Sequence, residues 1–183
     1  KTLVILRWIA IVGQFFTISI VYFFLGFEIP FFYCSVIILF GVLTNIYLQF
    51  RVRENQLGNL SSTIYLLYDL VQLAALLYFT GGITNPFTIL LIIPAIVSST
   101  FLSLKSTLNL SFVTIIVLLV LTLYHLPLPY SGDLHFHVPN YYLYAIPTAV
   151  IIGLIFLTYF GSRFGIESRK RTEALNKLEL ILA

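Results

Sequence analysis

A short polar segment lies between two long apolar runs, and its residues have the chemistry to bind a ligand. The segment consists of Gly81, Gly82, Ile83, Thr84, Asn85, Pro86 and Phe87. Glycine adopts positive φ without steric cost, and Asn followed by Pro suits the start of a new helix. Backbone N–H groups, an amide and an aromatic ring together suit the carbonyls and flat face of a lipophilic molecule. A plain tight turn between membrane helices is the other interpretation, because these residue types mark turns generally.

Among the polar side chains inside the apolar runs, we single out those of Arg7, Asn45, Asp69 and Gln72 as candidates for a structural or coupling role. A carboxylate in hydrocarbon costs about 2.5–3.5 kcal/mol on insertion scales, so Asp69 is expected to face the bundle interior and to have a partner. Arg7 lies roughly 6 Å in from Leu3 and Asp69 about 10 Å above Ser62, a difference that a long arginine can bridge. Asn45 lies at a similar depth and is a further candidate. Two interpretations stay open: an Arg7–Asp69 contact, or an Arg7 that extends to lipid head groups beside a protonated Asp69.

These polar residues are separate from the polar segment. One helical stripe, with spacings of four and three, leads toward Gly81 and consists of Tyr65, Asp69, Gln72, Leu76 and Phe79. Asp69 and Gly81 are nevertheless roughly 18 Å apart along a helix that rises 1.5 Å per residue. We therefore do not expect Asp69 to contact a ligand at the segment.

The remaining reactive side chains do not predict metal or catalytic chemistry. His135 and His137 are two residues apart, a spacing that can chelate a metal, but no third ligand accompanies them. With His125 they are interpreted as loop histidines. Cys34 is the only cysteine, which excludes an internal disulfide, and a small buried apolar role is expected for it. We predict no catalytic residue and no metal site.

The composition predicts an integral membrane protein. Hydrophobic residues make up 60% of the chain and charged residues 9%, whereas soluble domains have about 25% charged residues. We predict an all-α bundle of six transmembrane helices within 1–162, each near the ~20 residues that a bilayer requires. They are expected at 3–25, 30–50, 62–80, 86–103, 107–126 and 142–162. Pro94 and Pro147 allow the fourth and sixth helices to bend.

Basic residues indicate the orientation of these helices. With six spans, all ten Lys and Arg residues fall on one side of the membrane: Lys1, Arg7, Arg51, Arg53, Lys105, Arg163, Arg169, Lys170, Arg171 and Lys177. Such residues mark the cytoplasmic side. We therefore expect both termini in the cytoplasm and the polar segment at the opposite surface. The net charge of +3 is thus a sign of orientation and does not indicate nucleic-acid binding.

Residues 163–183 are predicted to form a cytoplasmic linker helix. Leu175, Leu178 and Leu182 have the spacing of a coiled-coil seam, although the seam covers one heptad only. Two ion pairs with i,i+4 spacing support the helix, Glu167–Arg171 and Glu173–Lys177. We expect a soluble cytoplasmic part to follow this helix.

Three stretches together resemble the membrane sensor region of RegB/PrrB/ActS-type redox-responsive sensor histidine kinases. They are Leu6-Arg7-Trp8, Tyr68-Asp69-Leu70 leading into the polar segment, and His125-Leu126-Pro127-Leu128-Pro129. In that family a Gly-Gly-x-x-Asn-Pro-Phe heptapeptide is associated with ubiquinone binding, and the match here is complete. The family's phosphoacceptor histidine, ATP-binding domain and redox-active cysteine would follow residue 183. The chain itself is therefore expected to carry no kinase chemistry.

The resemblance implies a sensor of the quinone pool in a bacterial inner membrane. Ubiquinone would be the ligand, and ATP and Mg would be needed only in the kinase domain. Membrane lipid, a second copy in a homodimer and a response regulator would be the partners. We expect Asn85 and nearby N–H groups to bond the quinone carbonyls, with Phe79 and Phe87 beside the ring. The sixth helix would carry a redox-dependent shift to the kinase.

A small membrane transporter or channel is the competing interpretation. Buried charges and paired interrupted helices would favour it, but only Asp69 and Arg7 are candidates for such charges. A membrane-embedded enzyme ranks lower, because the sequence has no acidic cluster, no nucleophile beside a base and no metal-ligand spacing.

Overall fold

The structure is a computed structural model that describes residues 2–54, 58–128 and 139–182. Its helices are α1 (Thr2–Ser19) with the π-helical η1 (Ile20–Phe24), α2 (Phe31–Glu54), α3 (Asn59–Phe79), the 3₁₀ helices η2 (Gly82–Thr84) and η3 (Pro86–Ile92), α4 (Ile93–Phe101), α5 (Leu104–Leu123) and α6 (Asn140–Leu182). No strand occurs in these residues, which confirms the predicted all-α membrane bundle.

Five of the described helices are long and apolar enough to cross a membrane. The fourth predicted span differs, because it is a shorter apolar helix, Pro86–Phe101, which begins as the 3₁₀ helix η3 and continues as α4. A 3₁₀ helix rises about 2.0 Å per residue and an α-helix 1.5 Å, so this mixed helix extends roughly 28 Å. That length is close to the ~30 Å of a hydrocarbon core.

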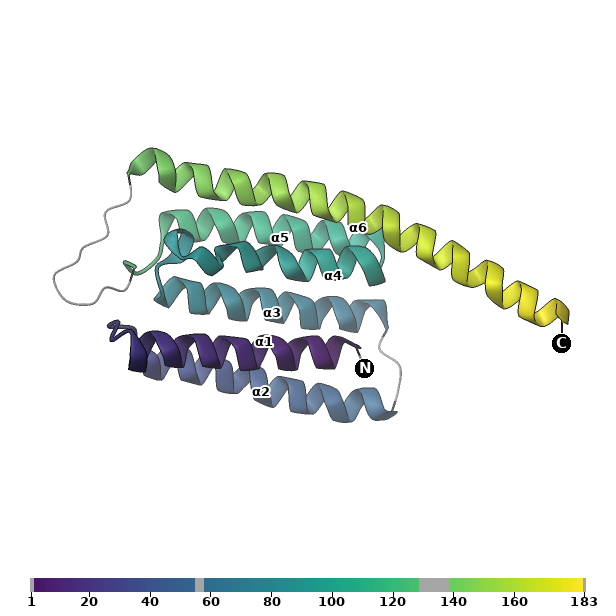
Figure 1. Ribbon diagram of the computed structural model, residues 1–183, viewed down its shortest axis with the longest axis horizontal. Helices are drawn as coiled ribbons and strands as arrows, with labels where there is room; N and C mark the ends of the chain where they lie inside the picture. Colours follow the sequence, from purple (N-terminus) through teal and green to yellow (C-terminus); the bar gives the residue numbers. More distant parts are fainter. Residues whose placement is uncertain (1, 55–57, 129–138, 183) are drawn as a thin grey trace.

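The helices form two packed groups that share α3 (Figure 1). One buried cluster joins α1, α2 and one face of α3 and includes Ile11, Ile38 and Leu76. The larger cluster joins the other face of α3 to α4, α5 and α6 and includes Leu70 and Leu118. Helix α3 is thus the common wall of the bundle, as expected for a helix that carries apolar residues on both faces.

The helix directions agree with the predicted even number of crossings. In Figure 1, α1, α3 and α5 begin, and α2 and α4 end, at the end of the bundle from which α6 projects. The α3–α4 turn lies at the opposite end. The basic residues Arg51, Lys105 and Arg163 lie toward the end of the bundle from which α6 projects. The structure therefore places the polar turn and these charges at opposite ends of the bundle.

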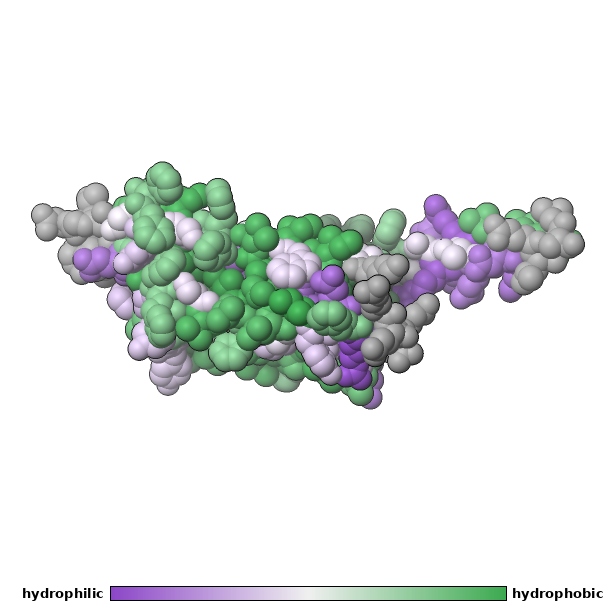
Figure 2. Space-filling model, turned by 90° about the horizontal axis from the view of Figure 1, so that it is seen from below, coloured by the Kyte–Doolittle hydropathy of each residue, from purple (hydrophilic) through white to green (hydrophobic). Residues whose placement is uncertain are grey.

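Helix α6 is longer than a membrane span and continues beyond the bundle. It runs from Asn140 to Leu182 without interruption at Pro147 or at the predicted boundary between residues 162 and 163. In Figure 2 the bundle surface seen from below is mainly hydrophobic, whereas hydrophilic residues gather on the projecting part of α6. Of the two predicted ion pairs only Glu167–Arg171 forms in the described part of this helix, with an N–O distance of 2.7 Å.

Candidate functional site

The polar segment is a compact turn whose backbone requires both glycines. Gly81 has φ +110° and Gly82 has φ +54°, values that other residues rarely adopt. Helix α3 ends at Phe79, and Asn85 caps η3 by accepting a hydrogen bond from the N–H of Phe87 at 2.9 Å. The predicted cap at Asn85 and the predicted first-turn position of Pro86 are both confirmed.

The side chain of Asn85 closes the turn by bonding to residues on both sides of it. Its Nδ2 donates to the carbonyl oxygen of Thr80 at 2.9 Å and to the Thr80 hydroxyl at 2.8 Å. The hydroxyls of Thr84 and Thr88 donate to the carbonyl oxygens of Gly81 and Gly82, at 2.6 and 2.8 Å. The turn is therefore pre-organised by its own polar groups, and both amide hydrogens of Asn85 already have acceptors.

The segment that follows α5, which contains His125, Leu126 and Leu128, covers the two glycines. A Cβ atom added to Gly82 would stand 2.3 Å from the Cβ of His125, and one added to Gly81 would stand 2.5 Å from Leu128. The N–H of Leu126 donates to the carbonyl oxygen of Tyr78 at 2.9 Å, which fixes this segment to the end of α3. Gly81, Gly82 and Ile83 are consequently buried. The rim consists of Thr84 and Asn85, which are partly buried, and of Pro86 and Phe87, which are exposed.

The two aromatic rings predicted to flank a ligand have different surroundings. Phe87 lies on the rim with 44% of its surface exposed. Phe79 is half-buried and stacks on Tyr33 of α2, with ring centroids 5.6 Å apart and an interplanar angle of 6°. Phe79 thus joins α3 to α2, whereas the Phe87 side chain is exposed.

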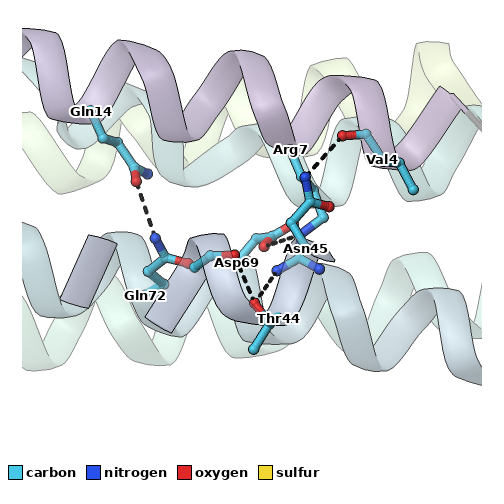
Figure 3. A network of polar contacts seen from close by, with 8 residues as sticks. Val4, Arg7, Gln14, Thr44, Asn45, Asp69 and Gln72 are labelled. Atoms are coloured by element: carbon cyan, nitrogen blue, oxygen red, sulfur yellow. Dashed lines mark hydrogen bonds and ion pairs between the residues drawn. The ribbon is translucent and has the colours of Figure 1, made fainter. Parts of the chain in front are cut away.

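The buried polar residues form a network between α1, α2 and α3 (Figure 3). Arg7 Nε lies 2.9 Å from Asp69 Oδ1, so the pairing interpretation is confirmed and Arg7 does not extend to lipid. The Arg7 side chain is 2% exposed. Its guanidinium carbon also lies 5.3 Å and 5.4 Å from the ring centroids of Tyr65 and Tyr68, distances at which aromatic faces stabilise a cation.

A third residue, Thr44, joins the Arg7–Asp69 pair, and it was not predicted from the sequence. Arg7 Nη2 donates to the Thr44 hydroxyl at 3.0 Å. Asn45, the residue predicted to join the pair, instead donates to the carbonyl oxygen of Val4 at 3.2 Å. On a helix, adjacent residues point about 100° apart, so sequence depth alone does not distinguish Thr44 from Asn45.

A second polar contact links α1 and α3 further along the bundle. Gln72 donates to Gln14 at 3.2 Å, and a Cβ atom at Gly41 of α2 would stand 2.5 Å from the Gln72 amide. Gly41 therefore provides the space that Gln72 occupies. Gln14 is a polar residue in an apolar run, which is the signal that identifies it in the sequence.

Helices α4 and α6 meet through small residues at the end from which α6 projects. A Cβ atom at Gly165 would stand 2.6 Å from the Thr100 carbonyl oxygen, and one at Gly161 would stand 2.0 Å from Ser99 Oγ. Arg169 Nη2 donates to the carbonyl oxygen of Leu102 at 3.0 Å, directly after α4. The spacing Gly161-x-x-x-Gly165 is typical of close helix packing in membranes, so this contact of α6 could have been predicted from the sequence.

Other predicted features lie partly outside the described residues. His135 and His137 are not in the described part of the chain, and no group of three potential metal ligands occurs in the part that is. Cys34 is fully buried, as predicted. Tyr141 and Tyr142 are exposed on the first turn of α6.

Comparison with known proteins identifies the class of this bundle. Residues 26–175 match the PilS-like transmembrane domain, and the chain belongs to that family. Sensor histidine kinase RegB of Cereibacter sphaeroides is 32% identical over 183 residues, and RegB of strain ATCC 17023 of that species is 33% identical over the same length. Each alignment covers 100% of this chain and 40% of the relative. No solved structure matches the chain.

These similarities confirm the resemblance to a RegB-type sensor membrane region. They support a multi-pass membrane region of a sensor histidine kinase, and the chain spans 40% of the length of the relatives that it matches.

Proposed function

We propose that this chain senses the redox state of the quinone pool for a histidine kinase, and that a ubiquinone headgroup binds at the turn between α3 and η3. The observation that carries this proposal is the turn itself, which is held in one conformation by internal hydrogen bonds and leaves a polar rim beside an exposed ring. Pre-organised sites of this kind lose little entropy on binding.

Each residue of the turn has a distinct part in this proposal. Phe87 offers a ring face to the headgroup, while Thr84, Asn85 and Pro86 form the rim. Gly81, Gly82 and Ile83 form the buried floor beneath it. Asn85 acts by holding the turn closed, since its amide hydrogens bond Thr80. Phe79 supports the site from the α2 side.

The route to the kinase runs through α4. Helix η3 continues directly into α4, so a displacement at the rim moves α4 along its axis. At its far end α4 contacts α6 at Gly161 and Gly165, and Leu102, the residue after α4, accepts a hydrogen bond from Arg169. A ligand shifts this arrangement only by the difference between its affinities for the two states.

The projecting part of α6 supports a homodimer. Leu175 and Leu178 are 61% and 54% exposed beyond the bundle, and their spacing matches a coiled-coil seam. A second copy of α6 would cover them and bring two kinase domains together. Those domains would use ATP and Mg and act on a response regulator. Both termini would then lie in the cytoplasm of a bacterium with the chain in its inner membrane.

Binding of a short-chain ubiquinone to the full-length protein in lipid nanodiscs tests the proposal. Phe87→Ala should weaken binding by about tenfold, as expected for loss of one aromatic stacking partner. Phe32→Ala is the matched control, because Phe32 is also an exposed ring, 72% exposed near the same end of the bundle. Equal effects of the two variants, or saturable binding in neither wild type nor variant, would contradict the proposal.

A further inference from the structure

We infer that a water molecule binds inside the bundle and bridges Arg7 Nη1 of α1 to Asn45 Oδ1 of α2. This inference is independent of the proposed quinone site, because it concerns the polar network between α1, α2 and α3. It assigns a ligand to two buried polar atoms that have no partner in the described part of the chain. The water would link α1 to α2 beside the Arg7–Asp69 pair.

Arg7 and Asn45 are neighbours in the interior of the bundle. Arg7 is 3% exposed and Asn45 is 0% exposed. Asn45 bonds the carbonyl oxygen of Val4, less than one turn before Arg7, and the residue next to it, Thr44, bonds Arg7 itself. Figure 3 shows the Asn45 amide beside the Arg7 side chain. A polar atom buried here without a partner costs free energy, because it has lost its bonds to solvent water.

The guanidinium of Arg7 has more donors than the surrounding side chains have acceptors. Nε forms the ion pair with Asp69 at 2.9 Å, and Nη2 donates to the Thr44 hydroxyl at 3.0 Å. The rings of Tyr65 and Tyr68 lie against the guanidinium carbon. Nη1 is buried and bonds none of the described residues. Because a guanidinium nitrogen only donates, Nη1 requires an acceptor.

The bond from Asn45 to Val4 determines which way the amide points. Nδ2 donates to the Val4 carbonyl oxygen at 3.2 Å. A carbonyl oxygen only accepts, so the amide nitrogen must face Val4 and the amide oxygen must face away from it. Oδ1 is buried, bonds none of the described residues and requires a donor. Reversing the amide would lose the bond to Val4, so the acceptor is fixed in this position.

Water is the ligand whose chemistry fits these two atoms. It accepts from the Nη1 N–H and donates to Oδ1, as an unpartnered donor and an unpartnered acceptor require. Asp69 already balances the charge of Arg7, so an anion bound here would have no counter-charge of its own. A cation would be repelled by the guanidinium. A neutral molecule that both donates and accepts avoids both costs.

Solid-state NMR of full-length protein in proteoliposomes, with nitrogen-labelled arginine, tests this inference. Magnetisation from a bound water reaches the Nη protons of Arg7 directly, so wild type should show a water cross-peak on that signal. The signal is assigned by its loss in the double variant Arg7→Met with Asp69→Leu. Asn45→Leu removes the acceptor and should abolish the cross-peak. Gln14→Leu is the matched control and should retain it, because this change also replaces an amide by leucine but removes only the contact with Gln72.

A structure of the full-length protein at a resolution that shows water gives an independent result and needs no variant. We expect a water oxygen at hydrogen-bond distance, about 2.7–3.2 Å, from both Arg7 Nη1 and Asn45 Oδ1. A direct hydrogen bond between these two atoms, or a cross-peak that persists in Asn45→Leu, would overturn the bridge. A wild type without the cross-peak would overturn the bound water. None of these results bears on the quinone site, which is tested by ubiquinone binding.

Discussion

A Cβ atom added to Gly165 of α6 would stand 2.6 Å from the carbonyl oxygen of Thr100 near the end of α4. Backbone therefore contacts backbone at this point, with no flexible side chain between the helices to absorb a displacement. Helices α4 and α6 are coupled here as rigid elements, and Arg169 adds a hydrogen bond from α6 to the residue that follows α4. A movement of α4 along its axis must be transmitted to α6 or must break this contact.

The first prediction concerns this joint. Gly165→Ala should destabilise the bundle by about 1–3 kcal/mol, because the new methyl group forces the two backbones apart. Gly153→Ala on the same helix should be neutral or stabilising by about 0.5–1 kcal/mol, since nothing lies within 4 Å of its added Cβ. Thermal unfolding in detergent measures both, and equal melting temperatures would refute the close contact. If the proposed quinone response runs through this joint, Gly165→Ala should also reduce that response in the full-length protein.

The second prediction concerns the buried ion pair. Asp69→Leu leaves the Arg7 guanidinium buried without its counter-charge and should cost about 3–5 kcal/mol. The double variant Arg7→Met with Asp69→Leu should recover most of that loss, because an apolar pair of similar size needs no charge compensation. Denaturation in detergent gives these values.

The control for this experiment is the exposed pair on α6. Glu167 and Arg171 are 66% and 77% exposed, so Glu167→Gln should cost less than about 1 kcal/mol. A loss in Asp69→Leu no larger than that in Glu167→Gln would show that the buried pair does not hold α1 to α3.

The third prediction concerns the turn. Gly82→Ala should destabilise the protein by at least about 1–2 kcal/mol, because φ is +54° and the new Cβ would meet His125. Gly13→Ala, whose added Cβ meets nothing within 4 Å, is the matched control. If Gly82→Ala melts at the wild-type temperature, the covering segment does not pack on the turn as described.

The fourth prediction concerns the dimer. With Cys34 replaced by Ser, a cysteine at Leu178 should form a disulfide between two copies in native membranes, because Leu178 lies on the proposed seam. A cysteine at Glu173, on the opposite side of the helix, should not. Cross-linking that is equally efficient at both positions would indicate random collision and exclude a seam on this face.

The fifth prediction concerns membrane topology. Glu28 lies exposed between η1 and α2, and Leu175 lies exposed on the projecting part of α6. Single cysteines at these positions should react with a membrane-impermeant maleimide from opposite compartments, with residue 28 labelled in intact cells whose outer membrane has been permeabilised. Labelling of both from one side would contradict the even number of crossings, and with it the route from the turn to the kinase.

The sequence alone predicted much of the architecture, because each of these inferences depends on local or statistical properties. A membrane span is identified by the length of an apolar run, and the positions of basic residues indicate its direction. The cap at Asn85 and the positive φ of Gly81 and Gly82 follow from residue type, since only a few residues suit such positions. The cost of a lone charge in lipid made an Arg7–Asp69 contact one of two interpretations, and the structure decided in its favour.

Only the tertiary structure decided which side chains meet across helices. It placed Thr44 on Arg7 instead of Asn45, stacked Phe79 on Tyr33, and brought His125 onto Gly82. These contacts depend on the rotation of each helix about its axis and on the path of the connection after α5. Neither is encoded by spacing within one segment, because rotation and path are set by the packing of all the helices together.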